Sequence, residues 1–244
     1  MSAADFRGVK ALAFDVFGTV VDWRGSILRE GAAWSAAKGL QVDWSGLADA
    51  WRAGYPLAMQ RARSGAIAWA TIDVLHRGIL DELIPRFGLD SLTEAERADL
   101  NRVWHRLDPW PDAVAGLQRL KRRFVICTLS NGNVSLLVNM ARRAGLPWDC
   151  VLSAELMRHY KPDPQVYQGA ARLLDVADHE LMMVAAHPSD LRGAARAGLR
   201  TAFVRRPLEH GPNPDRAAPP DALPDDRFDL VADDFVELAG LLGA

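Results

Sequence analysis

The chain of 244 residues has only two cysteines, no excess of either charge and no long hydrophobic run. Cys127 and Cys150 lie in or beside apolar runs, so we expect buried thiols rather than a disulfide or a metal pair. With 29 Lys+Arg against 31 Asp+Glu, the chain lacks the positive field that nucleic-acid binding requires. The apolar run at 11–21 is interrupted by Asp15 and is too short for a bilayer span or a signal-peptide core. We therefore expect a cytoplasmic globular protein with no nucleic-acid or membrane partner.

Five apolar runs are typical of buried strands. Their hydrophobicity is continuous, which a parallel sheet covered by helices on both faces requires. The expected strands cover residues 11–17, 124–130, 150–155, 181–187 and 201–206. Helical patterns lie between them, at residues 134–145, 164–176 and 190–198. We therefore predict an α/β fold with a Rossmann-like, doubly wound parallel sheet, whose ligand site lies at the carboxyl ends of the strands.

About a hundred residues separate the first two expected strands, a span far beyond ordinary loop lengths. This segment shows helical periodicity, for example in SILREGAAWSAAKG and IDVLHRGILDELIPRFG. We therefore predict an inserted helical cap domain at residues 23–107. The core domain is then formed by residues 1–22 and 108–244.

Tryptophan and proline are unevenly distributed along the chain. Seven of the eight tryptophans fall between Trp23 and Trp110. We expect most of them to fill a helical core and one or two to line an apolar pocket. The Pro-rich segment at 206–226 is expected to form an irregular excursion on the surface.

Asp15 ends the first expected strand, and Phe17, Gly18 and Thr19 follow it in the turn towards the cap. By position alone, such an aspartate is typical of a turn or a helix cap. Four segments, however, resemble the motifs of the haloacid dehalogenase superfamily in content and order. They are DVFGTVVDW at 15–23, TLSNG at 128–132, HYKPDPQVY at 159–167 and MVAAHPSDLRGAARAGL at 183–199. Within the superfamily, the chain resembles the L-2-haloacid dehalogenases.

This resemblance implies a hydrolase that displaces halide from short 2-haloalkanoic acids. Asp15 would be the nucleophile and would form a covalent ester, which splits one difficult hydrolysis into two easier steps. Thr19, Ser130, Lys161 and Asp190 complete the implied catalytic set. The residues implied in substrate or halide binding are Phe17, Arg52, Asn131, Tyr167 and His187. The family also suggests a homodimer.

Two positions depart from the phosphatases of the superfamily. Phe17 replaces an aspartate that protonates the leaving alkoxide, a contribution typically worth ~10²–10⁴-fold, whereas halides other than fluoride leave without a proton. Ala185 replaces an aspartate that completes a magnesium site, and magnesium needs such oxygen ligands. We therefore expect neither a metal nor a cofactor. The alternatives are a phosphatase or phosphonate hydrolase of the same superfamily and a non-catalytic member that acts as a binding protein.

Several core residues admit more than one interpretation. Ser130 and Asn131 end a strand, where they can hold a small anion or cap the following helix. Lys161 is either a solvated loop charge or an ammonium that reaches back to the nucleophile. Asp190 can hold that lysine, orient the hydrolytic water or cap its helix.

The roles of Arg52 in the cap and His187 in the core are also open. Arg52 occupies the place of an arginine that draws off the halide in L-2-haloacid dehalogenases, but Arg61 and Arg63 are neighbouring alternatives. His187 stands where those enzymes carry an asparagine. It can donate to departing fluoride, act as a base for water in the second step or be a structural histidine.

Overall fold

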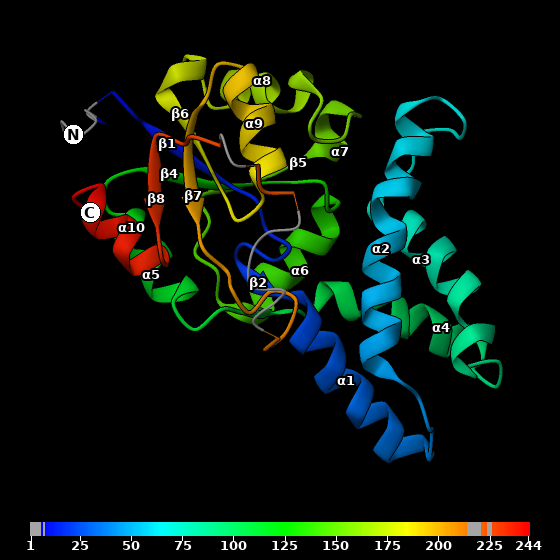
Figure 1. Cartoon of the computed structure of the whole chain (residues 1–244). Coiled ribbons are helices and arrows are strands. Elements are labelled where there is room, and N and C mark those ends of the chain that lie inside the picture. The colour runs from blue at the N-terminus through cyan, green and yellow to red at the C-terminus, as the bar shows by residue number, and fades with distance from the viewer. Residues whose placement is uncertain (1–5, 7, 214–220, 224–225) are drawn as a thin grey trace.

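The core of the protein is a parallel sheet of six strands, seen in Figure 1. The computed structural model describes residues 6, 8–213, 221–223 and 226–244. The strands follow the order β5-β4-β1-β6-β7-β8. Their bounds are β1 Ala11–Phe14, β4 Val125–Ser130, β5 Cys150–Ser153, β6 Leu181–Ala185, β7 Arg200–Val204 and β8 Leu230–Ala232. The five expected strands are all present, mostly shorter than expected because the apolar runs continue past the ends of the strands.

The chain enters the sheet at its centre and extends it first to one side and then to the other. β1 pairs in parallel with both β4 and β6. The order therefore reverses beside β1, which makes its carboxyl end a topological switch point. Ligand sites of open α/β sheets lie in the crevice outside this point. Asp15 directly follows β1 and therefore lies where the sequence analysis expected the ligand site.

Helices cover both faces of the sheet, because alternate residues of β1 point into two different apolar clusters. Leu12 and Phe14 belong to the cluster that includes α5, α6 and α10. Ala11 and Ala13 belong to the cluster that includes α7, α8 and α9. The bounds are α5 Ala113–Leu120, α6 Val134–Ala144, α7 Ala154–Met157, α8 Pro164–Leu173, α9 Pro188–Arg196 and α10 Phe235–Leu241. A 3₁₀ helix, η3, spans Asp178–Glu180.

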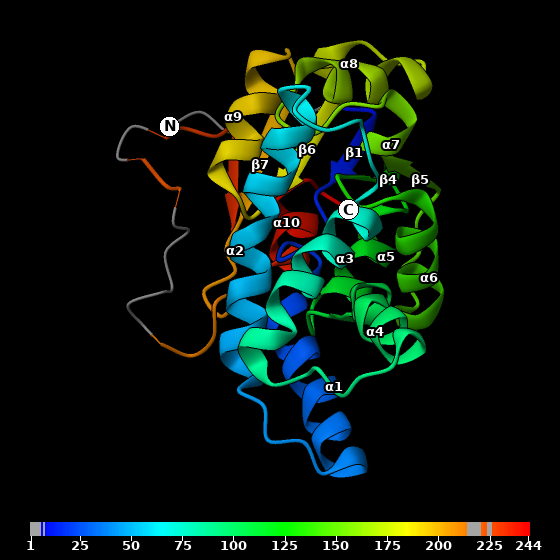
Figure 2. The same cartoon turned by 90° about the vertical axis from the view of Figure 1, so that its right-hand side faces the viewer.

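A helical segment leaves the core after β1 and returns before α5. The antiparallel pair β2 (Val21–Asp22) and β3 (Asp108–Pro109) marks its two ends. Figures 1 and 2 show α1–α4 gathered on one side of the sheet. The bounds are α1 Trp23–Lys38, α2 Trp44–Arg63, α3 Ile72–Leu83, η1 Pro85–Phe87, α4 Glu94–Asn101 and η2 Arg102–His105. This arrangement is compatible with a core domain and a cap domain at 23–107. The division into these two domains stays a prediction.

The aromatic residues of the cap pack against the core next to β1. Trp23, Trp51 and Trp104 are fully buried, and Trp104 packs edge-to-face against Phe17 at 5.6 Å between ring centroids. The expectation that most tryptophans fill a helical core therefore holds for these three. Cys127 and Cys150 are free thiols, but only Cys127 is buried. Cys150 is half-exposed because it begins the edge strand β5.

Parts of two sequence predictions lie outside the described residues. These are residues 1–5 and 7 of the core, and residues 214–220 and 224–225 of the Pro-rich segment. The described beginning of that segment is not simply a surface excursion, since Glu209 is only 4% exposed. In the part of the chain that the structure describes, no helix is long and apolar enough to cross a membrane.

Candidate active site

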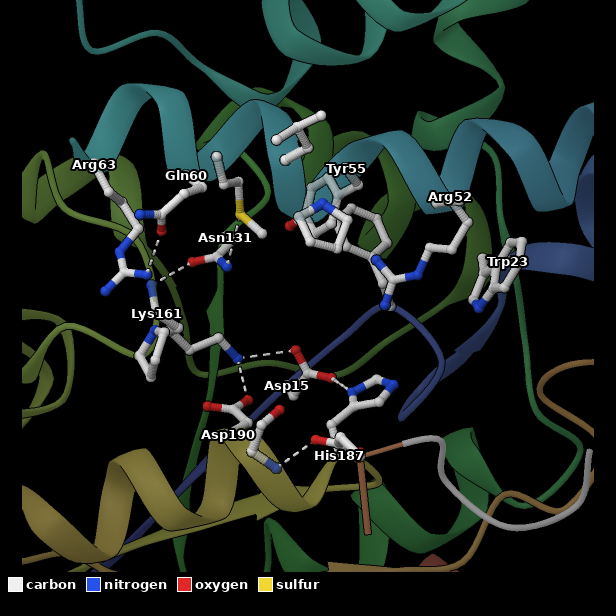
Figure 3. A pocket seen from close by; sticks show the side chains of 18 of the residues that line it. Asp15, Trp23, Arg52, Tyr55, Gln60, Arg63, Asn131, Lys161, His187 and Asp190 are labelled. Carbon is white, nitrogen blue, oxygen red and sulfur yellow. Dashed lines mark hydrogen bonds and ion pairs between the residues drawn. The ribbon is translucent and has the colours of Figure 1, made fainter. Parts of the chain in front are cut away.

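Asp15 lies at the base of a pocket between α2 and the carboxyl edge of the sheet (Figure 3). The cavity has a volume of about 930 Å³. Asp15 follows the last residue of β1, and its backbone N–H still donates to Val184 of β6, at 3.0 Å. Only 7% of the residue is exposed. The strand thus fixes a buried carboxyl group at the pocket.

Three donors hold the Asp15 carboxylate. Lys161 Nζ lies 2.9 Å from Oδ1, while the Thr19 hydroxyl at 2.7 Å and His187 Nδ1 at 3.0 Å both contact Oδ2. Burial alone would raise the pKa of this carboxyl group. The charge of Lys161 and the hydrogen bond and charge of His187 outweigh burial and hold the pKa well below its usual range. Asp15 is therefore ionised at neutral pH.

Thr19 is held in place from the opposite side. The backbone N–H of Ala186, just after β6, donates to its hydroxyl oxygen at 2.9 Å. The hydroxyl proton is then left for Asp15, because the oxygen already accepts a hydrogen bond. Thr19 is fully buried and lies behind the carboxylate rather than in the pocket lining.

Lys161 joins the two carboxylates of the site. Its ammonium contacts Oδ1 of Asp15 and Oδ2 of Asp190, and its backbone N–H donates to Asn131 Oδ1 at 2.8 Å. Tyr167 donates its hydroxyl to Asp190 Oδ1 at 2.7 Å. Burial opposes the charge on Lys161, but Asp15 and Asp190 raise its pKa. The ammonium therefore bridges a buried carboxylate pair and offsets part of its charge.

Asp190 differs from Asp15 in its electrostatics. Burial and the charge of Asp15 raise the pKa of Asp190, although Lys161 acts in the opposite direction. Asp190 lies in the first turn of α9, but its side chain turns to Lys161 and Tyr167. Of the interpretations weighed for Asp190, holding Lys161 has direct geometric support.

Ser130 is the last residue of β4 and Asn131 follows it, but the two side chains have different contacts. Asn131 lines the pocket and positions the backbone of Lys161. Ser130 is fully buried behind the pocket, and its oxygen accepts the Gly132 N–H at 3.1 Å. The structure therefore brings Asn131, but not Ser130, to the pocket wall.

Among the three arginines considered for the halide, Arg52 is the one directed at the Asp15 end of the pocket (Figure 3). Its guanidinium lies over the rings of Tyr55 and Trp23, at 5.0 and 5.7 Å from their centroids. Arg63 lines the far end of the pocket and pairs with Asp163. Arg61 is exposed and outside the lining. The geometry favours Arg52 for the predicted role.

The apolar wall beside the carboxylate includes Phe17 and Trp23. Trp23 thus confirms the expectation that one or two tryptophans line the pocket. Phe17 is 3% exposed and occupies the position where the phosphatases carry their acid. Ala185 is fully buried at the end of β6. Within the described ranges, no group of three or more His, Cys, Asp or Glu side chains is arranged to hold a metal ion.

His187 bridges two carboxylates. Its Nδ1 lies 3.0 Å from Asp15 Oδ2, and its Nε2 lies 2.9 Å from Glu209 Oε1. A ring nitrogen facing a carboxylate oxygen must donate, so both nitrogens carry protons and the ring is a cation. This arrangement leaves no lone pair to accept a proton from water and no free N–H for departing fluoride. It therefore supports neither of the two direct roles considered for His187.

Glu209 is a residue beside the site that the sequence analysis missed, as it missed the pocket residues Tyr55 and His210. It lies in the connection after β7, inside the segment expected to be a surface excursion. Its position so far along the chain from Asp15 gives no local pattern that links the two. His210 follows it and lines the pocket, whereas Glu209 lies behind the lining.

The fold and site together define a doubly wound α/β protein with a buried carboxylate at the switch point. The family profile described as haloacid dehalogenase-like hydrolase matches residues 9–198. The chain therefore belongs to the haloacid dehalogenase-like hydrolases. It is 32% identical over 218 residues to "(S)-2-haloacid dehalogenase 1" of Pseudomonas sp. (strain CBS-3), a match that covers 85% of this chain and 91% of that protein.

Two solved structures are similar over almost the whole chain. The L-2-haloacid dehalogenase PA0810 is 46% identical, with a TM-score of 0.91 and coverage of 96% of this chain and 99% of that one. The defluorinating L-2-haloacid dehalogenase Rha0230 is 44% identical, with a TM-score of 0.89 and coverage of 97% and 96%. Both structural matches include the predicted cap segment. The family profile also includes this segment, together with most of the core.

Proposed function

We propose that the protein hydrolyses short 2-haloalkanoic acids, fluoroacetate included, to 2-hydroxy acids through an aspartyl ester on Asp15. The observation that carries the proposal is the buried Asp15 carboxyl group at the base of a pocket that also contains Arg52. The names of the similar proteins support the substrate class, and the defluorinating relative supports fluoroacetate. The enzyme is thus a hydrolase acting on carbon–halide bonds.

In the first step, a carboxylate oxygen of Asp15 attacks C2 of the substrate. The new C–O bond forms as the carbon–halogen bond breaks, and the halide leaves with the bonding electrons towards Arg52, with inversion at C2. The apolar Phe17 is compatible with this step because chloride and bromide leave without a proton. Lys161 and Asn131 supply fixed donors beside the reacting groups, which is how electrostatic preorganisation lowers a barrier.

In the second step, water attacks the ester carbonyl of Asp15. The oxygen of this water stays on Asp15. The bond between Cγ and the Asp15 oxygen that attacked C2 breaks, so that this oxygen leaves in the 2-hydroxy acid. Asp190 supports this step as the second buried carboxylate beside Lys161, with Tyr167 fixing its orientation. Its raised pKa favours temporary uptake of a proton from the water.

A halide-release assay tests the proposed function. We expect release from chloroacetate, fluoroacetate and one enantiomer of 2-chloropropionate. Rates should be unchanged after exhaustive chelation, because Lys161 rather than a metal supplies the positive charge between the two carboxylates. Phosphate esters serve as the control substrates. Phosphate release that depends on magnesium would favour the phosphatase alternative, and no turnover of any substrate would favour a non-catalytic binding protein.

The covalent step has its own test. With enzyme in excess over substrate and H₂¹⁸O as solvent, the hydroxyl oxygen of the first product molecule comes from Asp15, so the product is expected to carry ¹⁶O. The heavy isotope then appears in the Asp15 peptide, measured by mass spectrometry. Product that carries ¹⁸O in this single turnover would instead mean that water attacks C2 directly.

Two further properties belong to the same proposal. We place the enzyme in the cytoplasm, where the free thiols Cys127 and Cys150 are compatible with a reducing environment. We also propose a homodimer, on the resemblance to the L-2-haloacid dehalogenases. Sedimentation measurements at several protein concentrations test the dimer directly.

A further inference from the structure

Glu209 is a buried carboxylate with no part in the two steps above. It is 4% exposed, and its Oε1 accepts hydrogen bonds from His187 Nε2 at 2.9 Å and from Trp23 Nε1 at 3.0 Å. The turn after Asp15 packs against it, since a Cβ at Gly18 would lie 2.1 Å from Oε1. Gly18 also has a φ of +83°, which favours glycine. This close packing fixes the carboxylate in one place.

The two oxygens of Asp15 are not equivalent. Oδ2 receives the Thr19 hydroxyl and the Nδ1–H of His187, whereas Oδ1 receives the Lys161 ammonium. The oxygen with two donors is the better site for negative charge that stays on Asp15. Oδ1, with one donor, is then the oxygen that attacks C2. After this attack Oδ2 is the carbonyl oxygen of the ester.

We propose that Glu209 is a positioning residue for ester hydrolysis, holding the His187 ring so that its Nδ1–H donates to the oxyanion that forms on Oδ2. The inference rests on the proposed function and deepens it. When water bonds to Cγ of Asp15, it passes a proton to Asp190, and the carbonyl electrons move to Oδ2. Collapse breaks the Cγ–Oδ1 bond, and Oδ1 leaves in the 2-hydroxy acid with the proton that Asp190 had taken up. The second proton of the water passes to solvent as Asp15 returns to its ionised form.

The charges around the ring fit this role. Asp15 and Glu209 face the ring on its two sides, while Arg52 and His210 are the further charged or titratable groups near Glu209. Burial disfavours a charged ring, but Glu209 and Asp15 raise the pKa of His187 to about 10. Burial disfavours a charged Glu209, but the charge of His187 lowers its pKa to about 2. The pair is thus ionised across the neutral range.

Glu209→Gln tests the proposal because the amide is nearly isosteric but carries no charge. With bromoacetate and rapid mixing, we expect bromide release in the first turnover within about 3-fold of wild type. Steady-state turnover should fall roughly 10- to 100-fold, as expected when an oxyanion donor is weakened, and the ester on Asp15 should accumulate in the mass spectrum. Glu94→Gln, which changes an exposed cap carboxylate paired with Arg77, is the matched control. Unchanged steady-state turnover, or a slower first turnover without ester, would overturn the proposal.

Two measurements separate this role from a merely structural one. Ring ¹⁵N NMR should show His187 doubly protonated at pH 7.5 in wild type. In Glu209→Gln the pKa of the ring should be lower, so the ring loses a proton at a lower pH than in wild type. If Glu209 acts through the ring, adding Glu209→Gln to His187→Asn should have no further effect on turnover. A neutral ring in the wild-type protein, or additive effects, would contradict the inference. If wild type releases no halide, the proposed function fails, whereas the NMR result still decides whether Glu209 holds the ring.

Discussion

Asp15→Asn is expected to abolish halide release while leaving the fold intact. The amide has nearly the same shape as the carboxylate but no anionic oxygen to attack C2. Loss of a covalent nucleophile costs ~10⁴–10⁶-fold in turnover, so we expect a fall of at least about 10⁴-fold. The fold should survive because Lys161 keeps Asp190 as a partner and His187 keeps Glu209. Halide release and thermal unfolding of freshly prepared protein measure the two effects.

The control for this variant is Asp233→Asn. It makes the same chemical change at a carboxylate that is 72% exposed and paired only at the surface, with Arg205, and it should leave turnover unchanged. Deamidation would regenerate Asp15, so the mass of the Asp15 peptide must show an intact amide. More than a tenth of wild-type turnover from protein with that mass would mean that Asp15 is not the nucleophile.

The fold was predictable where burial leaves a continuous signal in the sequence. The central strands are covered on both faces, so their residues are nearly all apolar and stand out from the rest of the chain. β8 was missed because it has only three residues and Val231 is exposed on it. The short helices α5, α7 and α10 were missed as well, because eight residues or fewer give little periodicity.

The site was predictable where its residues belong to the motifs at the strand ends. Asp15, Lys161 and Asp190 come together because their segments meet at one edge of the sheet, as the parallel topology requires. Arg52 could not be separated from its neighbours, because only the orientation of α2 decides which arginine faces Asp15. Glu209 could not be found at all, since a Pro-rich connection gives no pattern that predicts burial.

Lys161→Met is expected to impair both stability and turnover. Asp15 and Asp190 would keep their buried carboxylates without the ammonium between them, and removal of one partner from a buried ion pair costs about 3–5 kcal/mol. Turnover should fall roughly 10³-fold, because a preorganised charged donor next to the nucleophile is lost. Urea unfolding and halide release measure the two effects. Lys10→Met is the control, since Lys10 pairs with Glu180 at the surface, where such a pair contributes about 1 kcal/mol or less.

The loss of stability in Lys161→Met should depend on pH. Burial and the charge of Asp15 already raise the pKa of Asp190, and Lys161 is the group that opposes them. Without Lys161 the folded-state pKa rises further above the value of about 3.9 for an unfolded aspartate. The folded state then binds more protons than the unfolded state between these two values, so stability falls as pH rises through this window. We therefore expect a smaller deficit relative to wild type at pH 5 than at pH 8.

Combining Lys161→Met with Asp190→Asn distinguishes the structural from the chemical role of the ammonium. The double variant has no uncompensated carboxylate at position 190, and Asp15 keeps the donors Thr19 and His187. We expect most of the lost stability to return and its dependence on pH to disappear, while turnover stays as low as in the single variant or lower. Recovery of turnover together with stability would show that Lys161 serves the fold alone. A single variant as stable as wild type at pH 8 would show that the two carboxylates do not need its charge.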